Sequence, residues 1–380
     1  MRWQLLLLMM LVLMSGGMAR SQTTSDSSPN MSWTSTNQQS DTAGAVNPTR
    51  TRTTHSETNG RTVDRTSVER MGPDGRYVPY SDVERESVKV NETTTRNIER
   101  TFGRGPDGQR TLIQERQEEL RELPGGEQKA VRTTSNPDGD GRLQVVQRET
   151  TDSRQVSPGV RETKTTISSA DGSGGLSPTV QVEEHTRQTD KATTEFRKST
   201  SLSDGAGHWT LSEIREGTTK RDASGTGTKE ERVLRPGSDG KLALVERTVS
   251  KEAKAAGGES RETTETYSTD VPGMAGDNGL QLVRRESTVQ GRSSSGVQTT
   301  KRTVERTNPG DPGAGLHLSQ EAIDIVRPGA SGVARRESTI RASDANGSTN
   351  TVWVDLGKTD NPPAVTVDTG SKKSEVKSQK

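Results

Sequence analysis

The chain has 380 residues, of which only 25% are hydrophobic. Globular domains usually contain about 45–50% apolar residues, so the composition excludes a large conventional core. Lys and Arg together number 53 and Asp and Glu together 52, which gives a net charge of +1 and predicts no nucleic-acid partner. The chain has no Cys, which excludes disulfides.

The segment Met1–Ala19 has the pattern of a secretory signal peptide. Arg2 supplies a positive start, Leu5–Met14 is a short apolar run, and small residues precede a cut after Ala19. A membrane-spanning helix needs about 20 apolar residues, so this run is too short. No later stretch is more apolar. We therefore expect a secreted or periplasmic protein with no membrane span in the mature chain.

Residues 20–58 are rich in Ser, Thr, Asn and Gln and contain very few aliphatic residues. This composition predicts a flexible linker. Trp33 is its one aromatic residue, and we interpret it as an incidental surface residue.

Glycine-containing turn signals recur at a fixed spacing from about residue 60 onward. Successive turn glycines lie about 33 residues apart, and a constant period of this size is typical of a repeat protein. Looser breaks, such as Pro158-Gly159, fall about halfway between them. The glycines that mark this period are Gly75, Gly108, Gly141, Gly175, Gly207 and Gly240.

The segments between the turns alternate as β-strands do. The clearest is Pro236–Ser250, where Asp239-Gly240 supplies a turn and Leu242–Val249 follows with period-two alternation. We predict an all-β, elongated antiparallel meander of about 17 strands, built from two-strand repeats of about 33 residues over residues 59–357. A barrel or two packed layers remain open. The rival prediction is a largely disordered, low-complexity chain.

The C-terminal end of the chain is predicted to contain one further strand and a flexible tail. Val352–Leu356 is one more strand candidate, and Pro362-Pro363 interrupts the chain. Residues 358–380 are expected to form a flexible basic tail that ends in Ser371–Lys380.

Several short motifs resemble chemical sites but lack the necessary context. Gly103–Gly108 fits G-x-G-x-x-G, yet Pro106 and a following strand replace the helix that would hold a pyrophosphate. Asp138–Gly141 and Asp344–Gly347 offer carboxylates without the full ligand set of a calcium loop. Gly225–Lys229 lacks the spacing of a phosphate loop. We therefore expect no cofactor and no metal site.

The histidines do not form the pattern of a catalytic or metal-binding site. His55, His185, His208 and His317 are scattered, with no i, i+4 pair and no recurring acidic partner. We predict no catalytic, cofactor-binding or metal-binding residue, and a protein that is not an enzyme.

These observations favour an exported, non-enzymatic repeat protein with a structural or surface-interaction role. One alternative is an extracellular module that binds polysaccharide or protein through Trp209, Tyr77 and Tyr80. Another is a secreted disordered spacer. The segment Asp138–Leu143 resembles the strand-turn units of Rhs-type shell repeats over this turn alone, which assigns no family.

Overall fold

The computed structural model describes most of the chain as antiparallel β-strands. The described residues are 30–40, 46–72, 74–105, 108–222, 226–254, 258–271, 274, 279–308, 310–328, 334–343 and 349–359. Within them no helix is long and apolar enough to cross a membrane. A 3-10 turn, η1 (Pro124–Gly126), lies between two of the strands.

The strands follow one another along the chain as a meander. The first ten are β1 (Asn30–Ser40), β2 (Val46–Thr58), β3 (Arg61–Met71), β4 (Tyr77–Lys89), β5 (Thr94–Arg104), β6 (Arg110–Glu122), β7 (Gln128–Pro137), β8 (Leu143–Ser157), β9 (Val160–Ala170) and β10 (Leu176–Gln188). The others are β11 (Thr193–Ser203), β12 (Trp209–Arg221), β13 (Gly227–Pro236), β14 (Leu242–Lys254), β15 (Ser260–Ser268), β16 (Gln281–Arg292), β17 (Gln298–Asn308), β18 (Asp311–Pro328), β19 (Ala334–Ser343) and β20 (Thr349–Thr359).

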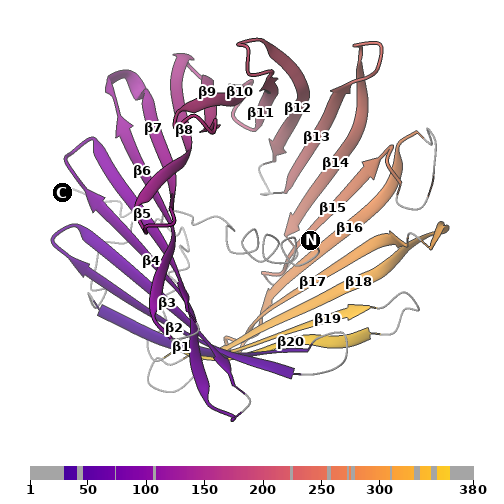
Figure 1. The fold of residues 1–380 in the computed structure, drawn as a ribbon. Helices are drawn as coiled ribbons and strands as arrows, with labels where there is room; N and C mark the ends of the chain where they lie inside the picture. The colour runs from indigo at the N-terminus through magenta and orange to yellow at the C-terminus, as the bar shows by residue number, and fades with distance from the viewer. Residues whose placement is uncertain are drawn as a thin grey trace, which may run out of the picture.

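The meander closes on itself. Each strand pairs with its neighbour in the chain, and β1 also pairs with β20, with Gln38 opposite Val354. All 20 strands therefore form one sheet that is rolled into a barrel (Figure 1). The all-β antiparallel meander is confirmed. The elongated open form that we favoured is wrong, because closure pairs the two edge strands.

The predicted period appears in the strand boundaries. The even strands from β4 to β14 begin at Tyr77, Arg110, Leu143, Leu176, Trp209 and Leu242, at the constant spacing expected of a repeat. One period is a hairpin of two strands. Beyond β14 the spacing becomes irregular, since β16 begins at Gln281 and β18 at Asp311.

A β-bulge recurs in every hairpin from β3–β4 to β19–β20. In each, the register shifts by one residue, and the residue opposite the shift on the odd strand is β-branched, as with Val68 and Val233. A bulge bends its strand and increases the local twist. Bulges repeated at one height therefore curl the sheet until its edges meet. The extra residues are Tyr80, Ile113, Val146, Thr179, Ser212, Val245, Val283, Ser319 and Val352.

The predicted Asp-Gly turns close these hairpins. In the turn between β13 and β14, Gly237 N donates to Lys241 O over 2.8 Å and Gly240 N donates to Gly237 O over 2.9 Å. Gly240 has a φ of 76°, a conformation that glycine adopts without steric cost. The turn prediction is confirmed at this position.

Two strands lie where a linker was expected. The structure places β1 and β2 within residues 20–58, and these strands join β20 to β3. The low aliphatic content of this segment concealed its strands, because here pairing to neighbouring strands supplies the stability. The expected signal peptide and residues 360–380 lie outside the described residues, so those assignments stay predictions, as does the extent of the repeat region.

Candidate functional site: an apolar collar and a polar inner wall

Apolar side chains recur on the even strands between each bulge and its turn. We call them the apolar collar. They form two rows, because each strand contributes residues two positions apart that point to the same face. The row beside the bulges is Pro79, Leu112, Val145, Pro178, Leu211, Leu244, Leu282 and Leu318; the row nearer the turns is Tyr77, Leu143, Leu176, Trp209, Leu242 and Leu316.

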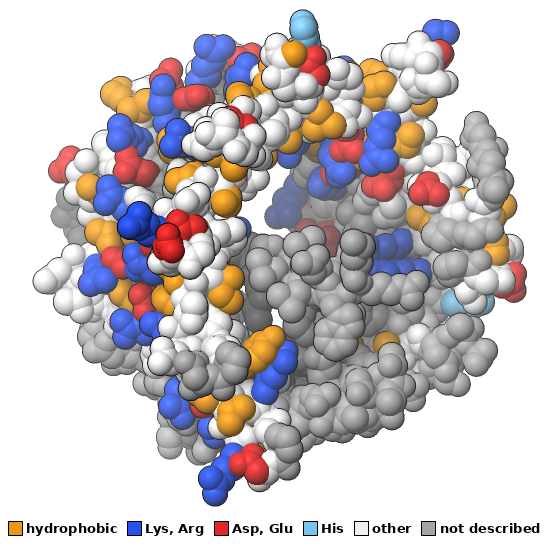
Figure 2. Space-filling view, viewed as in Figure 1, with side chains coloured by type: hydrophobic (Ala, Val, Ile, Leu, Met, Phe, Trp, Pro, Cys, Tyr) orange, Lys and Arg blue, Asp and Glu red, His pale blue; other side chains and the backbone are white. Residues whose placement is uncertain are grey.

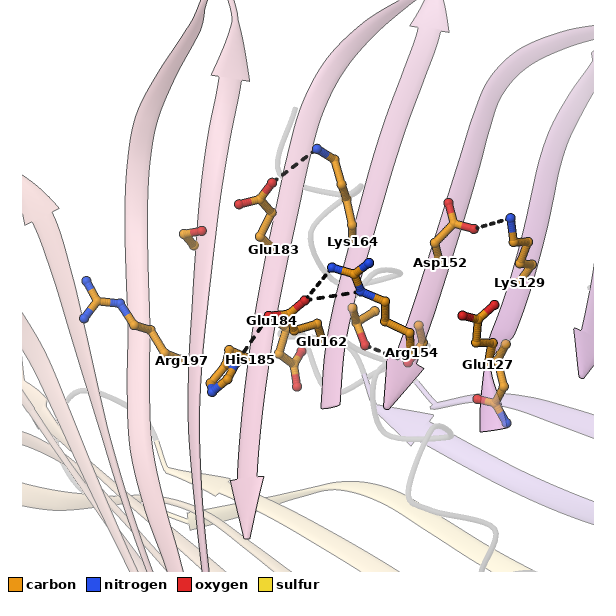
Figure 3. Close-up of a pocket in the computed structure, with 14 residues that line it drawn as sticks. Glu127, Lys129, Asp152, Arg154, Glu162, Lys164, Glu183, Glu184, His185 and Arg197 are labelled. Atoms are coloured by element: carbon orange, nitrogen blue, oxygen red, sulfur yellow. Dashed lines mark hydrogen bonds and ion pairs between the residues drawn. The ribbon is translucent and has the colours of Figure 1, made fainter. Parts of the chain in front are cut away.

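The collar lies on the outer face. Pro178 pairs with Ser168, which shares its face with Lys164, and Lys164 lies on the outer surface of the barrel in the close-up of that wall (Figure 3). Several of its members are exposed, including Leu143 at 43% and Leu242 at 41%. Hydrophobic side chains are visible around the outside of the barrel near its open rim (Figure 2).

The collar is short. Two residues along a strand cover about 7 Å, and with the side chains the collar is about 10 Å tall. In β6 its second row is interrupted by Arg110, whose guanidinium lies 3.4 Å from the ring centre of Phe102. This stacking covers the apolar ring with a cation.

The outer face away from the collar is charged. Arg65 Nε donates to Glu84 over 3.0 Å, and Arg100 Nε donates to Glu115 over 2.7 Å. These residues face one another across neighbouring strands, where opposite charges contribute roughly 0.2–1 kcal/mol per pair. The strand stems are therefore held by cross-strand ion pairs.

An outer groove of about 680 Å³ crosses β7 to β11. Its walls carry the ion pairs of Arg154 with Glu162 at 2.9 Å and of Lys164 with Glu183 at 3.2 Å (Figure 3). These ion pairs neutralise much of the charge along the groove.

The inner wall is polar along its length. Pairs of hydroxyls face each other across strands, as do Thr151 and Thr165 at 2.9 Å and Ser250 and Thr264 at 2.8 Å. Figure 2 shows basic and acidic side chains on the part of the inner wall visible through the mouth. A wall of this kind suits water and hydrophilic solutes.

Most charges on the inner wall are matched. Arg132 contacts Glu118 at 2.6 Å and Glu149 at 3.4 Å, so one cation joins carboxylates on both neighbouring strands. Arg85 Nε donates to Glu99 over 2.6 Å. These networks stiffen the wall without giving it a net charge.

Carboxylates at three successive turns accept hydrogen bonds from the backbone of the turn. Asp138, Asp171 and Asp204 each begin a turn, and each accepts backbone N–H groups two and four residues ahead. Bonds from the Ser173 hydroxyl and backbone lower the pKa of Asp171 to about 2. Among the described residues no group of three His, Cys, Asp or Glu could hold a metal. Asp344–Gly347 lies outside them.

The histidines have acidic partners that we did not expect. His55 lies 2.6 Å from Asp64, His208 lies 2.9 Å from Asp204, and His185 lies 4.0 Å from Glu162. The partners of His55 and His185 lie on neighbouring strands, where sequence spacing does not reveal them, whereas Asp204 precedes His208 in the same turn. The pairs lie on different hairpins, so they do not converge on one centre.

The aromatic binding candidates lie at one rim. Trp209 and Tyr77 belong to the collar, and Tyr80 is the extra residue of the first bulge. Gly108, the end of the G-x-G-x-x-G match, has a φ of 77° in a hairpin turn and donates its N–H to Gly105 O. We did not predict the collar, although apolar residues recur once in each repeat, from Leu143 to Leu176 to Trp209.

No protein-family model matches the chain, and no curated protein matches it. Several solved structures match the chain. The siderophore receptor PirA from Acinetobacter baumannii matches 89% of this chain and 81% of its own with a TM-score of 0.47 and 7% identity. A mutant porin of Rh. blastica matches 63% and 94% with a TM-score of 0.39 and 7% identity. The outer membrane protein opdK from Pseudomonas aeruginosa matches 87% and 97%, with a TM-score of 0.34 and 9% identity.

The closed barrel corrects the expected function. The expectation of a secreted repeat protein with a structural or surface role, with polysaccharide or protein partners and without a membrane span, is wrong. The physical reason lies in the closed barrel and its outward apolar collar, which the open meander did not contain. The expected secreted or periplasmic location and the expected non-enzymatic role stay predictions.

Proposed function

We propose that the protein is a channel: a barrel that meets a lipid layer at its collar and gives hydrophilic solutes a path along its inner wall. The observation that carries this proposal is the closed 20-stranded sheet, which is polar inside and apolar outside at one height. Barrels of about 16–18 strands already leave an aqueous channel, because their inward side chains cannot fill the interior.

The collar determines how the barrel can meet lipid. Single-chain outer-membrane barrels carry an apolar band about 25 Å tall, which is more than twice the height of this collar. The lipid layer around the barrel therefore has to thin. An unpaired Arg or Lys facing the lipid midplane destabilises a barrel in the membrane by about 2–4 kcal/mol. The cross-strand ion pairs of the stems lower this free-energy cost but do not remove it.

Planar-bilayer recording tests the proposal directly. Purified protein added to one side should produce stepwise conductance, and it should float with liposomes in a density gradient. An intact barrel, with its strand content confirmed by circular dichroism, that gives no conductance steps would overturn the channel proposal.

A collar variant with a matched control sharpens the test. Leu143→Gln combined with Leu242→Gln removes two exposed collar side chains, which together contribute about 3 kcal/mol when buried in lipid. Liposome partitioning should fall about a hundred-fold. The control is Val131→Gln, which replaces a residue that is 42% exposed but lies outside the collar, and it should leave partitioning unchanged.

A further inference from the structure

Three arginines stand together on the inner wall where β16 meets β17. Arg284 on β16 lies directly opposite Arg306 on β17, and Arg302 is on the same face of β17, four residues before Arg306. Side chains directly opposite on an antiparallel pair have Cβ atoms about 5 Å apart. This spacing allows the two guanidinium groups to reach one small ligand.

One carboxylate, Glu286, pairs with two of the three arginines. Glu286 accepts a bond from Arg302 Nη2 over 2.6 Å and also pairs with Arg284. Among the residues that the structure describes, no carboxylate pairs with Arg306. Three cations beside one anion leave a local surplus of two positive charges.

The neighbouring acids are turned to other partners. Glu305 lies on the outer face, where it pairs with Arg285 at 3.5 Å. Asp324, on the inner face of β18, accepts a hydrogen bond from the Ser338 hydroxyl. Neither of these contacts neutralises the surplus.

Two of the three arginines also have a buried N–H donor without a hydrogen-bond partner. Nε of Arg284 and Nε of Arg306 are buried with no hydrogen-bond partner, and a buried unpaired donor is costly. Nε of Arg96 and Nε of Arg104 are also buried without a hydrogen-bond partner. Both of these guanidinium groups nevertheless form an ion pair through Nη2; that of Arg96 lies 3.2 Å from Glu119. Arg306 has no such ion pair among the described residues.

Several other arginines of the inner wall have carboxylate partners. Arg132 contacts two carboxylates, Arg215 contacts Glu231 at 3.3 Å, and Arg85 is bonded to Glu99. The side chains of Arg284 and Arg302 remain 37% and 35% exposed, so a dissolved ligand can reach them. Guanidinium groups bind carboxylate and phosphate oxygens through paired N–H donors.

We propose that Arg284, Arg302 and Arg306 form a binding site for a small oxyanion, one that carries a phosphate or carboxylate group, on the inner wall of the barrel. Arg306 supplies the free charge, Arg284 faces it across the strand pair, and Glu286 holds Arg302 beside them. The site depends on the closed barrel and does not require that the barrel conduct.

Calorimetric titration of the purified mature chain with inorganic phosphate at low salt tests the site. Saturable binding in the millimolar range or tighter is expected. Arg284→Gln combined with Arg306→Gln should weaken it at least ten-fold, whereas Arg306→Lys, which keeps the charge but loses the planar fork, should weaken it less. The matched control is Arg85→Gln, an inner-wall arginine that already has a carboxylate partner, and it should bind as the unaltered protein does.

Each outcome decides the proposal. Equal phosphate binding by the double variant and the unaltered protein would overturn it, as would the absence of saturable binding to a folded barrel. If the double variant does not fold, the single Arg306→Gln change decides, since it removes the unpaired cation and should weaken binding several-fold. Failure of conductance leaves this binding intact, so the two proposals fail separately.

Discussion

Turn residues show how one side chain can organise a hairpin. Asp138, Asp171 and Asp204 recur once in each repeat and begin equivalent turns. Each carboxylate accepts the backbone donors that the turn leaves without a ladder partner. The sequence predicted turns at these places, but their role as acceptors of backbone bonds required the structure, because a calcium ligand and a turn cap use the same residue type.

Asp171 should keep its charge in acid. Its pKa of about 2 lies below the usual 3.8, because the ionised form accepts bonds from Ser173, Ser177 and Gly175. A lowered pKa stabilises the fold above the ordinary value, and this contribution is lost as the pH falls from about 4 to about 2. The carboxyl resonance, followed by NMR during acid titration, should show a midpoint near 2.

A serine variant tests the cause of this shift. Ser173→Ala removes the hydroxyl that makes the largest contribution, so the midpoint of Asp171 should rise toward 3.8. Ser157→Ala, in β8 and away from this turn, should leave the midpoint in place. An unchanged midpoint in Ser173→Ala would contradict the assignment.

Among the elements, β12 depends on a glycine. Gly217 lies opposite Phe196 of β11 and Glu231 of β13. A Cβ at Gly217 would overlap the carbonyl oxygen of Glu230 and would lie 2.8 Å from a ring carbon of Phe196. The glycine therefore permits the close approach of three strands, with an aromatic ring packed over it.

Gly217→Ala should destabilise the barrel by about 2–3 kcal/mol, because backbone atoms of β13 cannot move aside as a flexible side chain could. The matched change is Gly291→Ala, in β16, where a Cβ would meet nothing within 4 Å. Urea unfolding followed by circular dichroism should show a lower midpoint for Gly217→Ala alone. Equal midpoints for the two variants would rule out this close packing.

At the scale of the whole molecule, closure depends on the pairing of β1 with β20. The two strands are separated by nearly the full described length of the chain, and no local signal links them. The bulges supply the curvature that brings them together, and the pairing removes the exposed edges that an open sheet would present to other chains.

A cross-link should capture this closure. Gln38→Cys combined with Val354→Cys places two thiols at opposite positions of the seam, in a chain that has no other cysteine. Opposite residues lie about 4.5–5.5 Å apart at Cα, within the range of a disulfide. Oxidation should give a monomeric species with altered mobility on a non-reducing gel.

The control for the seam uses a strand from elsewhere in the meander. Gln38→Cys combined with Ser168→Cys pairs β1 with β9, which is not its neighbour, and should not form the same intramolecular bond. If both variants cross-link equally, or neither does, the barrel is not closed as described.

The sequence by itself determined the local structure of this protein. The alternation in Leu242–Val249, the Asp239-Gly240 turn and the constant spacing of the turns predicted strands, hairpins and an antiparallel meander, because each depends on residues close together in the chain. Only the tertiary structure decided which way the sheet curves, which face of each strand points outward, and that β1 and β2 belong to it. Those features depend on a register set by bulges such as Val245 and on a seam between distant strands, where each contribution is too small to be recognised in one segment alone.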